Sequence, residues 1–192
     1  MNEPMTGYIG VSDLKQTPGF KNGHAPTFFQ TMLLGEGLAQ DVEVWGAGLM
    51  AMLRNKAQGR TRIDPKGLRA WKEGFSCIWK EHGVWEFDAS GSPKLLRPDY
   101  FTGYDFGREG YVPFAKKYSE RIQRVIPQAM IFAEMPPMDF GGTEFPVIKP
   151  SDIPNVVNAA HWYDMITLLT TTWRSYFSMN FISGKPAFGN KA

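Results

Sequence analysis

Apolar residues recur at helical spacing in one clear stretch of the chain, from about Tyr111 to Ile126. One side of this predicted helix carries Phe114, Tyr118, Ile122, Val125 and Ile126, and the other carries Lys116, Lys117, Glu120, Arg121 and Arg124. We expect the apolar side to face the core and the basic side to face solvent. Contact of the basic side with a membrane surface is the alternative.

A short unbroken apolar run follows at residues 129–133, and residues 156–160, apolar apart from Asn158, are a second strand candidate. An unbroken apolar run of this length is typical of a strand that is buried on both faces in a parallel sheet. After them, Asp164 is predicted to cap a helix with Met165, Leu169, Trp173 and Phe177 along one side. The order helix, strand, loop, strand, helix predicts an α/β protein with parallel pairing.

Residues 5–110 have a different texture, because they are rich in glycine, proline and aromatic residues without a long strand or helix period. Within them, residues 39–53 are predicted to be helical, and Asp64-Pro65 is predicted to start a short helix over residues 67–76. The rest resembles a layer of loops. Long loops of this kind are more often functional lids than simple connectors.

The composition is that of an ordinary globular protein, with 43% hydrophobic and 21% charged residues among 192. This length suffices for one domain with a sizeable core. The net charge of +2 and the absence of a Lys/Arg block give no reason to expect a nucleic-acid partner. The longest weakly charged apolar stretch, Val44 to Leu53, is too short to span a bilayer.

Metal and cofactor chemistry find no support in the sequence. Cys77 is the single cysteine, which excludes an internal disulfide and a cysteine-based zinc site. His24, His82 and His161 are far apart and lack ligand spacing, and no glycine-rich motif that would cradle phosphate occurs. The lone cysteine and the absence of an Asn-x-Ser/Thr acceptor favour a reducing, cytosolic setting.

Several segments, spread over most of the chain, resemble one enzyme family. They are Met1-Asn2-Glu3-Pro4, Pro26-Thr27-Phe28-Phe29-Gln30, Val42-Glu43-Val44-Trp45, Cys77-Ile78-Trp79-Lys80-Glu81-His82-Gly83-Val84-Trp85-Glu86, Leu95-Leu96-Arg97-Pro98-Asp99-Tyr100-Phe101 and Ala160-His161-Trp162-Tyr163-Asp164. The chain resembles glycoside hydrolase family 5, in the endoglycoceramidase-related branch of fungal glucosylceramidases and steryl-β-glucosidases. Asn-Glu-Pro alone is a weak signal, whereas the long aromatic segments are specific.

The resemblance implies a (β/α)8 barrel that hydrolyses β-glycosides of lipids with retention of configuration. On this basis Glu3 matches the acid/base and Asn2 the neighbouring substrate-binding asparagine. His161 and Tyr163 match substrate-binding residues that follow the sixth strand. Residues 129–133 then take the place of the fifth strand, and Glu134 at its end is a candidate for binding sugar hydroxyls.

The same resemblance implies that the catalytic pair is incomplete. Retention requires two carboxyl groups about 5–5.5 Å apart, and no glutamate follows Tyr163 to serve as the nucleophile that ends the seventh strand. We therefore interpret residues 1–192 as one incomplete catalytic domain. It comprises a partial barrel from the end of strand 4 to just past strand 6, with residues 5–110 as a lid insertion and 111–192 as barrel elements. The isolated chain is expected to be inactive.

Two further hypotheses stay open at this point. One is a non-catalytic glycolipid-binding or interaction module that reuses the loop layer, and the other is a gene-model fragment without an independent role. Trp79, His82 and Trp85 matter for the first, since flat aromatic faces suit sugar rings and apolar lipid groups. Packing within the core is an equally good interpretation of these side chains.

Overall fold

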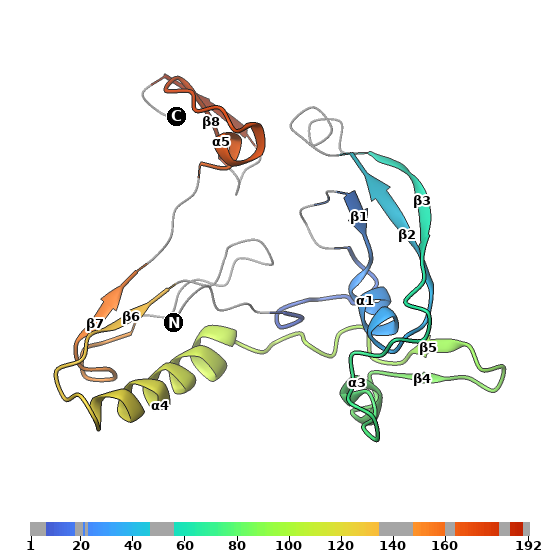
Figure 1. Cartoon of the computed structure of the whole chain (residues 1–192), viewed down its shortest axis with the longest axis horizontal. Helices are drawn as coiled ribbons and strands as arrows, with labels where there is room; N and C mark the ends of the chain where they lie inside the picture. Colours follow the sequence, from blue (N-terminus) through green and yellow to red (C-terminus); the bar gives the residue numbers. More distant parts are fainter. Residues whose placement is uncertain are drawn as a thin grey trace.

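The structure is a computed structural model that describes residues 7–17, 21, 23–46, 56–134, 148–159, 164–180 and 185–189. The described elements are mixed α/β, as the sequence predicts. An antiparallel sheet with short helices and a hairpin comes first, and a long helix with a parallel strand pair follows. Figure 1 shows these two parts on opposite sides of the view, with a C-terminal helix and hairpin as a third part.

The antiparallel sheet contains β1 (Gly23–Ala25), β2 (Gln40–Trp45) and β3 (Ala57–Ile63) in the order β1-β2-β3. The predicted helix over residues 39–53 is therefore wrong for residues 40–45, and residues 47–53 lie outside the described part. Strand alternation explains the difference, because Val42 is buried in β2 while its neighbour Asp41 is exposed. Helix α1 (Phe28–Gly35) precedes β2 and begins with a capping box between Thr27 and Gln30.

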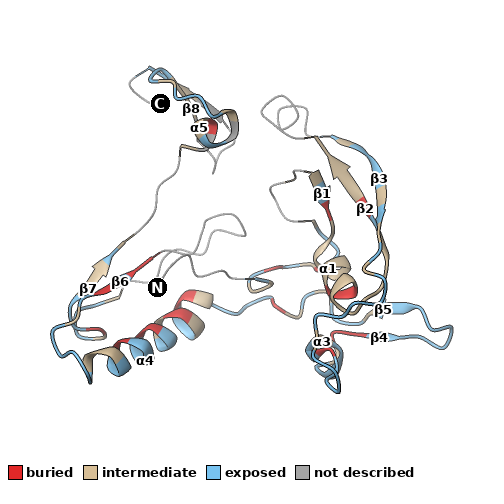
Figure 2. Cartoon of the chain, in the orientation of Figure 1, coloured by how far each residue is buried: buried red, intermediate tan, exposed pale blue. Residues whose placement is uncertain are grey.

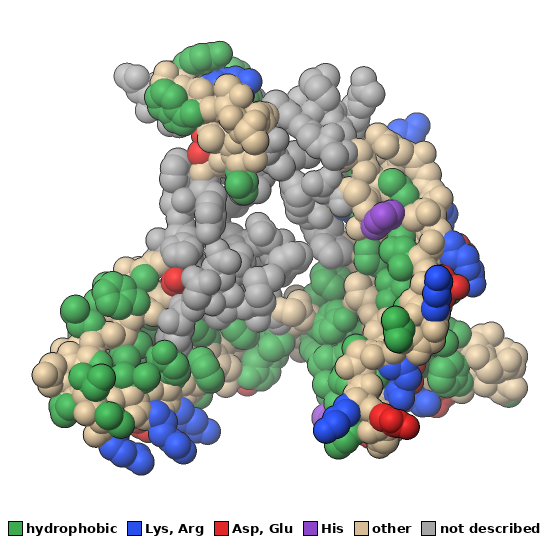
Figure 3. Space-filling view, viewed as in Figure 1, with side chains coloured by type: hydrophobic (Ala, Val, Ile, Leu, Met, Phe, Trp, Pro, Cys, Tyr) green, Lys and Arg blue, Asp and Glu red, His purple; other side chains and the backbone are tan. Residues whose placement is uncertain are grey.

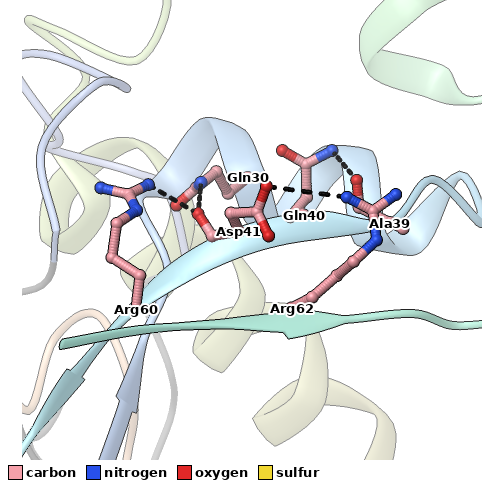
Figure 4. A network of polar contacts seen from close by, with 6 residues as sticks. All are labelled: Gln30, Ala39, Gln40, Asp41, Arg60 and Arg62. Atoms are coloured by element: carbon pink, nitrogen blue, oxygen red, sulfur yellow. Dashed lines mark hydrogen bonds and ion pairs between the residues drawn. The ribbon is translucent and has the colours of Figure 1, made fainter.

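A polar network ties α1 to the sheet (Figure 4). The Gln30 side chain and Arg60 of β3 both donate to the backbone oxygen of Asp41, at 2.8 and 2.7 Å. The carboxylate of Asp41 lies 3.6 Å from Arg62 in an exposed ion pair. Because β3 is an edge strand, its two arginines also disfavour pairing with another chain.

Residues 64–76 form turns, so the predicted short helix over 67–76 is wrong. Lys66 and Gly67 have φ of 53° and 74°, and Gly74 has φ of 83°, which no right-handed helix contains. Asp64 supports the turn by accepting a hydrogen bond from the backbone of Lys66 at 2.8 Å. Gly67 also packs against Gly37, where a Cβ would lie 3.0 Å from the Gly67 backbone.

A hydrophobic core lies within residues 8–101. Helix α3 (Ile78–Glu81) and the antiparallel hairpin of β4 (Trp85–Phe87) and β5 (Pro93–Leu95) contribute to it. Its buried members are Val11, Leu14, Met32, Leu33, Cys77, Val84, Trp85 and Phe101. The region that the sequence presents as a layer of loops thus has strands, helices and a core of its own, and its role as a lid stays a prediction.

The second part begins with a π-helix, η1 (Phe106–Tyr111), that continues directly into α4 (Val112–Gln123). The predicted helix over 111–126 is confirmed in its main part, and Pro113 occupies its first turn, where the missing N–H costs nothing. Its basic side is exposed, as expected.

The buried side of α4 agrees with the prediction at Ile122, which packs against the cluster of Ala115, Ile131 and Ile153, and differs from it at the other predicted residues. Phe114 is 58% exposed, and Tyr118, Val125 and Ile126 are exposed too. Instead the small residues Ala115 and Ser119 are buried, and Ala115 packs with Ile131 and Ile153. Small side chains let the helix approach the strands closely, which the large aromatics would prevent. Figure 2 shows the buried seam along α4, and Figure 3 shows hydrophobic side chains beside lysines and arginines over this helix.

The parallel strand pair consists of β6 (Ile131–Ala133) and β7 (Val156–Asn158), as the two apolar runs predict. Ile131 pairs with Val156, and Ala133 pairs with Asn158. The expectation that the strand is buried on both faces is wrong for β6. Ile131 and Ala133 are buried, whereas Phe132 between them is 51% exposed, because α4 covers only one face of the pair.

The C-terminal part contains α5 (Met165–Thr170), β8 (Phe177–Asn180) and β9 (Lys185–Phe188), the last two in an antiparallel hairpin. Asp164 caps α5 as predicted, but the helix does not extend to Trp173 and Phe177. It stops at Thr171, whose φ is 53°. The hydroxyls of Thr170, Thr171 and Thr172 bind nearby backbone oxygens, a competition that shortens helices.

Candidate active site at the ends of the parallel strands

The carboxyl ends of β6 and β7 meet at one edge of the parallel pair. Glu134 follows β6 directly and is 9% exposed, and Asn158 ends β7. The backbone of Ala159 donates to the oxygen of Ala133 at 2.9 Å, which keeps the two strand ends together. In α/β folds with parallel strands, ligands bind at this edge, because loops after neighbouring strands converge there.

Strand alternation assigns the side chains to two faces. Ile131 packs with Ala115 of α4, and Ala133 is buried as well. Phe132 between them belongs to the other face. Glu134 follows the strand directly and is buried, whereas Phe132 is 51% exposed.

Tyr111, the last residue of η1, reaches the same edge. Its side chain is 2% exposed, and its hydroxyl donates to the backbone oxygen of Glu134 at 2.8 Å. Burial raises the pKa of the Tyr111 hydroxyl, and the nearby Glu134 carboxylate raises that pKa further. The hydroxyl therefore remains a protonated donor throughout the neutral range.

Of the site residues that the sequence predicts, the structure describes Glu134. Asn2, Glu3, His161 and Tyr163 lie outside the described residues. Tyr111 was missed by the sequence reasoning, which used it only as the start of a helix. A signal was present, since Tyr111, Ala115 and Ser119 follow one another at intervals of four and form the buried seam.

The three aromatic candidates of the first part have different environments. Trp85 is fully buried among core residues, so it offers no platform to a sugar. Trp79 is half-buried and meets Tyr8 and Phe101 edge-on, with ring centroids 5.5 and 5.2 Å away. His82 is exposed, and its Nδ1 lies 2.9 Å from the hydroxyl of Tyr100. Core packing is thus the role of Trp85.

The described residues show no sign of two other kinds of site. No group of three or more His, Cys, Asp or Glu side chains among them is arranged to hold a metal ion. Among the same residues, no helix combines the length and the apolar character needed to cross a membrane.

Comparison with known proteins finds no matching family model but several relatives. The glucosylceramidase of Aspergillus fumigatus is 35% identical over 231 aligned positions, which cover 100% of this chain and 29% of the relative. The ergosteryl-beta-glucosidase of Saccharomyces cerevisiae is 30% identical, over 98% of this chain and 28% of its own length. A crystal structure of Cryptococcus neoformans sterylglucosidase 1 superposes with a TM-score of 0.77 at 31% identity, covering 95% of this chain and 28% of that one.

The chain is related to these fungal glycosidases. It spans under a third of their length, since the alignments cover 29% and 28% of the two curated relatives named above. The resemblance drawn from the sequence is confirmed at this level. The family 5 assignment, the barrel and the catalytic roles go further than these likenesses and are proposals.

Proposed function

We propose that the chain is part of a retaining β-glycosidase of glycolipids, such as glucosylceramide or a steryl glucoside. The observation that carries this proposal is the buried Glu134 at the carboxyl end of a parallel strand pair. A (β/α)8 barrel collects its active-site residues at that end. The relatives named glucosylceramidase and ergosteryl-beta-glucosidase support the substrate class.

In this proposal β6 and β7 are consecutive strands of a family 5 barrel, and α4 is the helix before β6. Glu3 is the acid/base that protonates the leaving oxygen, and Asn2 binds the sugar beside it. Glu134, His161 and Tyr163 bind the substrate from the ends of the two described strands. Two carboxyl groups on opposite sides of the glycosidic bond are needed for retention, and residues 164–192 contain no glutamate that could serve as the nucleophile.

A segment exchange tests the proposal directly. The region of the Aspergillus fumigatus glucosylceramidase that aligns with this chain is replaced by the chain, and the purified chimera is assayed on glucosylceramide. We expect hydrolysis that Glu3→Gln abolishes, while Glu73→Gln, an exposed residue in the first part, leaves it unchanged. Proton NMR of the first-formed glucose reports retention as the β-anomer. A folded chimera without activity would contradict the proposal.

The isolated chain provides the complementary measurement. Without a nucleophile it is expected to release no fluorophore from a β-glucoside above the buffer rate. Turnover by the isolated chain that Glu3→Gln removes would show that a second carboxylate of this chain completes the pair.

A second candidate function is a non-catalytic glycolipid-binding module, favoured by the separate core within residues 8–101. Calorimetry and co-sedimentation with vesicles that contain glucosylceramide test it. Neutral vesicles without glycolipid are the first control, and anionic vesicles are the second, because the exposed basic side of α4 favours peripheral contact with anionic lipid. This candidate would be removed if glucosylceramide vesicles produced no heat of binding and did not co-sediment with the chain.

A further inference from the structure

The hydrogen bond from Tyr111 to Glu134 joins residues that are 23 positions apart in the chain. It connects the end of η1 with the first residue after β6, at the edge where the two parallel strands finish. Both residues are buried. Loss of a buried hydrogen bond to a backbone oxygen costs more free energy than loss of an exposed one, because no water replaces the missing donor.

The last peptide groups of β6 are held from two sides. The oxygen of Ala133 accepts from the backbone of Ala159 after β7, at 2.9 Å. The next oxygen, that of Glu134, accepts from Tyr111 instead, at 2.8 Å. The described register of the strand pair reaches Ala133, and the contact with Tyr111 holds the backbone of the next residue, which carries the carboxylate.

The ring of Tyr111 is itself held by the π-helix. Phe106, at the first turn of η1, stacks on it with ring centroids 6.2 Å apart and planes 29° from parallel. Gly110 leaves room for the Tyr104 hydroxyl, which would lie 3.2 Å from a Cβ at that position. Asp105 caps η1 by accepting from the backbone of Arg108 at 2.9 Å. π-Helical turns are rare and occur frequently at functional sites.

We propose that Tyr111 is a positioning residue for Glu134. Its hydroxyl fixes the place where β6 ends and thereby the direction in which the Glu134 carboxylate leaves the strand. Tyr111 does not itself touch the sugar. The inference depends on the proposed function only for the role of Glu134 toward substrate, because the contact between the two residues belongs to the fold.

NMR of the full chain with isotope-labelled glutamate tests the contact without any substrate. The Glu134 carboxyl signal is assigned by its loss in Glu134→Gln. Tyr111→Phe, which keeps the ring, is expected to shift this signal, because the carboxyl group then takes a different position. The matched control Tyr118→Phe lies on the exposed side of α4 and should leave the signal unchanged. An unchanged signal in Tyr111→Phe overturns the proposal.

A reciprocal measurement covers the case in which Tyr111→Phe fails to fold. In the chain with isotope-labelled tyrosine, Glu134→Gln removes the negative charge beside Tyr111. The pKa of the Tyr111 hydroxyl is then expected to fall towards its ordinary value, since that carboxylate raises it. A pKa of Tyr111 that does not respond to Glu134→Gln also overturns the proposal.

The Aspergillus chimera separates this inference from the proposed function. There we expect Tyr111→Phe to raise KM for a β-glucoside by about threefold to tenfold with a smaller change in kcat. The double variant with Glu134→Gln should be no worse than Glu134→Gln alone, because one residue acts through the other. Additive losses in the double variant would contradict the positioning role of Tyr111.

An inactive but folded chimera would contradict the proposed function. The two NMR measurements would still decide the role of Tyr111.

Discussion

The two larger parts of the molecule bury their hydrophobic residues to different extents. In the first, within residues 8–101, large side chains from loops, α1, α3 and the β4–β5 hairpin converge on one core around Trp85. In the second, α4 covers one face of β6 and β7 with small residues and leaves Phe114, Tyr118 and Phe132 exposed. The first part thus has the interior of a small independent unit. The second resembles one layer of a larger fold, as a barrel segment would.

This difference gives a physical measure of how far each part can fold by itself. Burial of apolar surface is the main favourable term in folding, at about 25 cal/mol per Å². The first part gains that contribution from its own buried core, whereas Phe114 and Tyr118 of α4 are 58% and 40% exposed. We therefore expect the two parts to unfold in separate transitions, with the first the more stable.

Trp85→Ala should produce the largest change, and only in the first part. Removing a fully buried tryptophan costs about 3–5 kcal/mol in the free energy of unfolding. Tryptophan fluorescence during urea unfolding reports mainly this part, which holds four of the six tryptophans, whereas residues 106–159 contain none. Trp173→Ala is the control, since Trp173 is 71% exposed and should change the free energy by less than about 0.5 kcal/mol. An equal effect of Trp85→Ala on the helix signal of α4 would show that the parts fold as one.

Ala115→Leu tests the unexpected seam of α4. A larger side chain has no room against Ile131 and Ile153, so we expect a loss of about 1–3 kcal/mol in the free energy of unfolding of the second part. Its neighbour Phe114→Ala is the matched variant and should cost little, because Phe114 faces away from the strands. Circular dichroism of the helix during urea unfolding measures both. The opposite ranking would mean that Phe114 faces the core, as the sequence pattern predicts.

This seam also marks the limit of what the sequence could predict. Hydrophobic periodicity identified the helix, and two short, mostly apolar segments identified β6, β7 and their parallel pairing, because these signals are local. The pattern placed Ile122 correctly but missed the rest of the side of α4 that meets the strands, since that depends on how closely Ala115 and Ser119 allow two elements to approach. It also missed β2 and the early end of α5, where strand alternation and threonine hydroxyls outweigh helical spacing.

The candidate site was predictable in part for the same reason. Glu134 follows from its place at the end of an apolar run, a local feature. The spacing of Tyr111, Ala115 and Ser119 indicates that Tyr111 is buried, but its contact with the backbone oxygen of Glu134, 23 residues away, is not visible in that spacing. The π-helix that delivers Tyr111 likewise depends on packing by Phe106 and Tyr104 rather than on a motif.

Thr27→Ala probes the first part at a smaller scale. Thr27 and Gln30 exchange hydrogen bonds at 3.1 and 3.0 Å at the start of α1. Loss of such a cap costs about 1 kcal/mol in the free energy of unfolding. The variant should lower the urea midpoint of the fluorescence-detected transition and leave the urea midpoint of the α4 helix signal unchanged. Thr27→Ser retains the hydroxyl and should restore most of the loss, and a failure of that rescue would argue against the capping role.

Acid titration gives the smallest effect and compares the first part with the C-terminal part. Hydrogen bonds from the Ser90 hydroxyl and nearby backbone lower the pKa of Asp88 in the β4–β5 hairpin. Those from the Thr167 hydroxyl and nearby backbone lower the pKa of Asp164 at α5. A carboxyl group whose pKa is lower in the folded state stabilises above its unfolded value, about 3.9 for Asp. That stabilisation is lost as pH falls through the folded pKa. Asp88→Asn should therefore weaken the loss of unfolding free energy at acid pH in the fluorescence-detected transition. Asp164→Asn should weaken that loss only for the C-terminal part. If either variant weakened the loss in both transitions, the hairpin and α5 would belong to one cooperative unit.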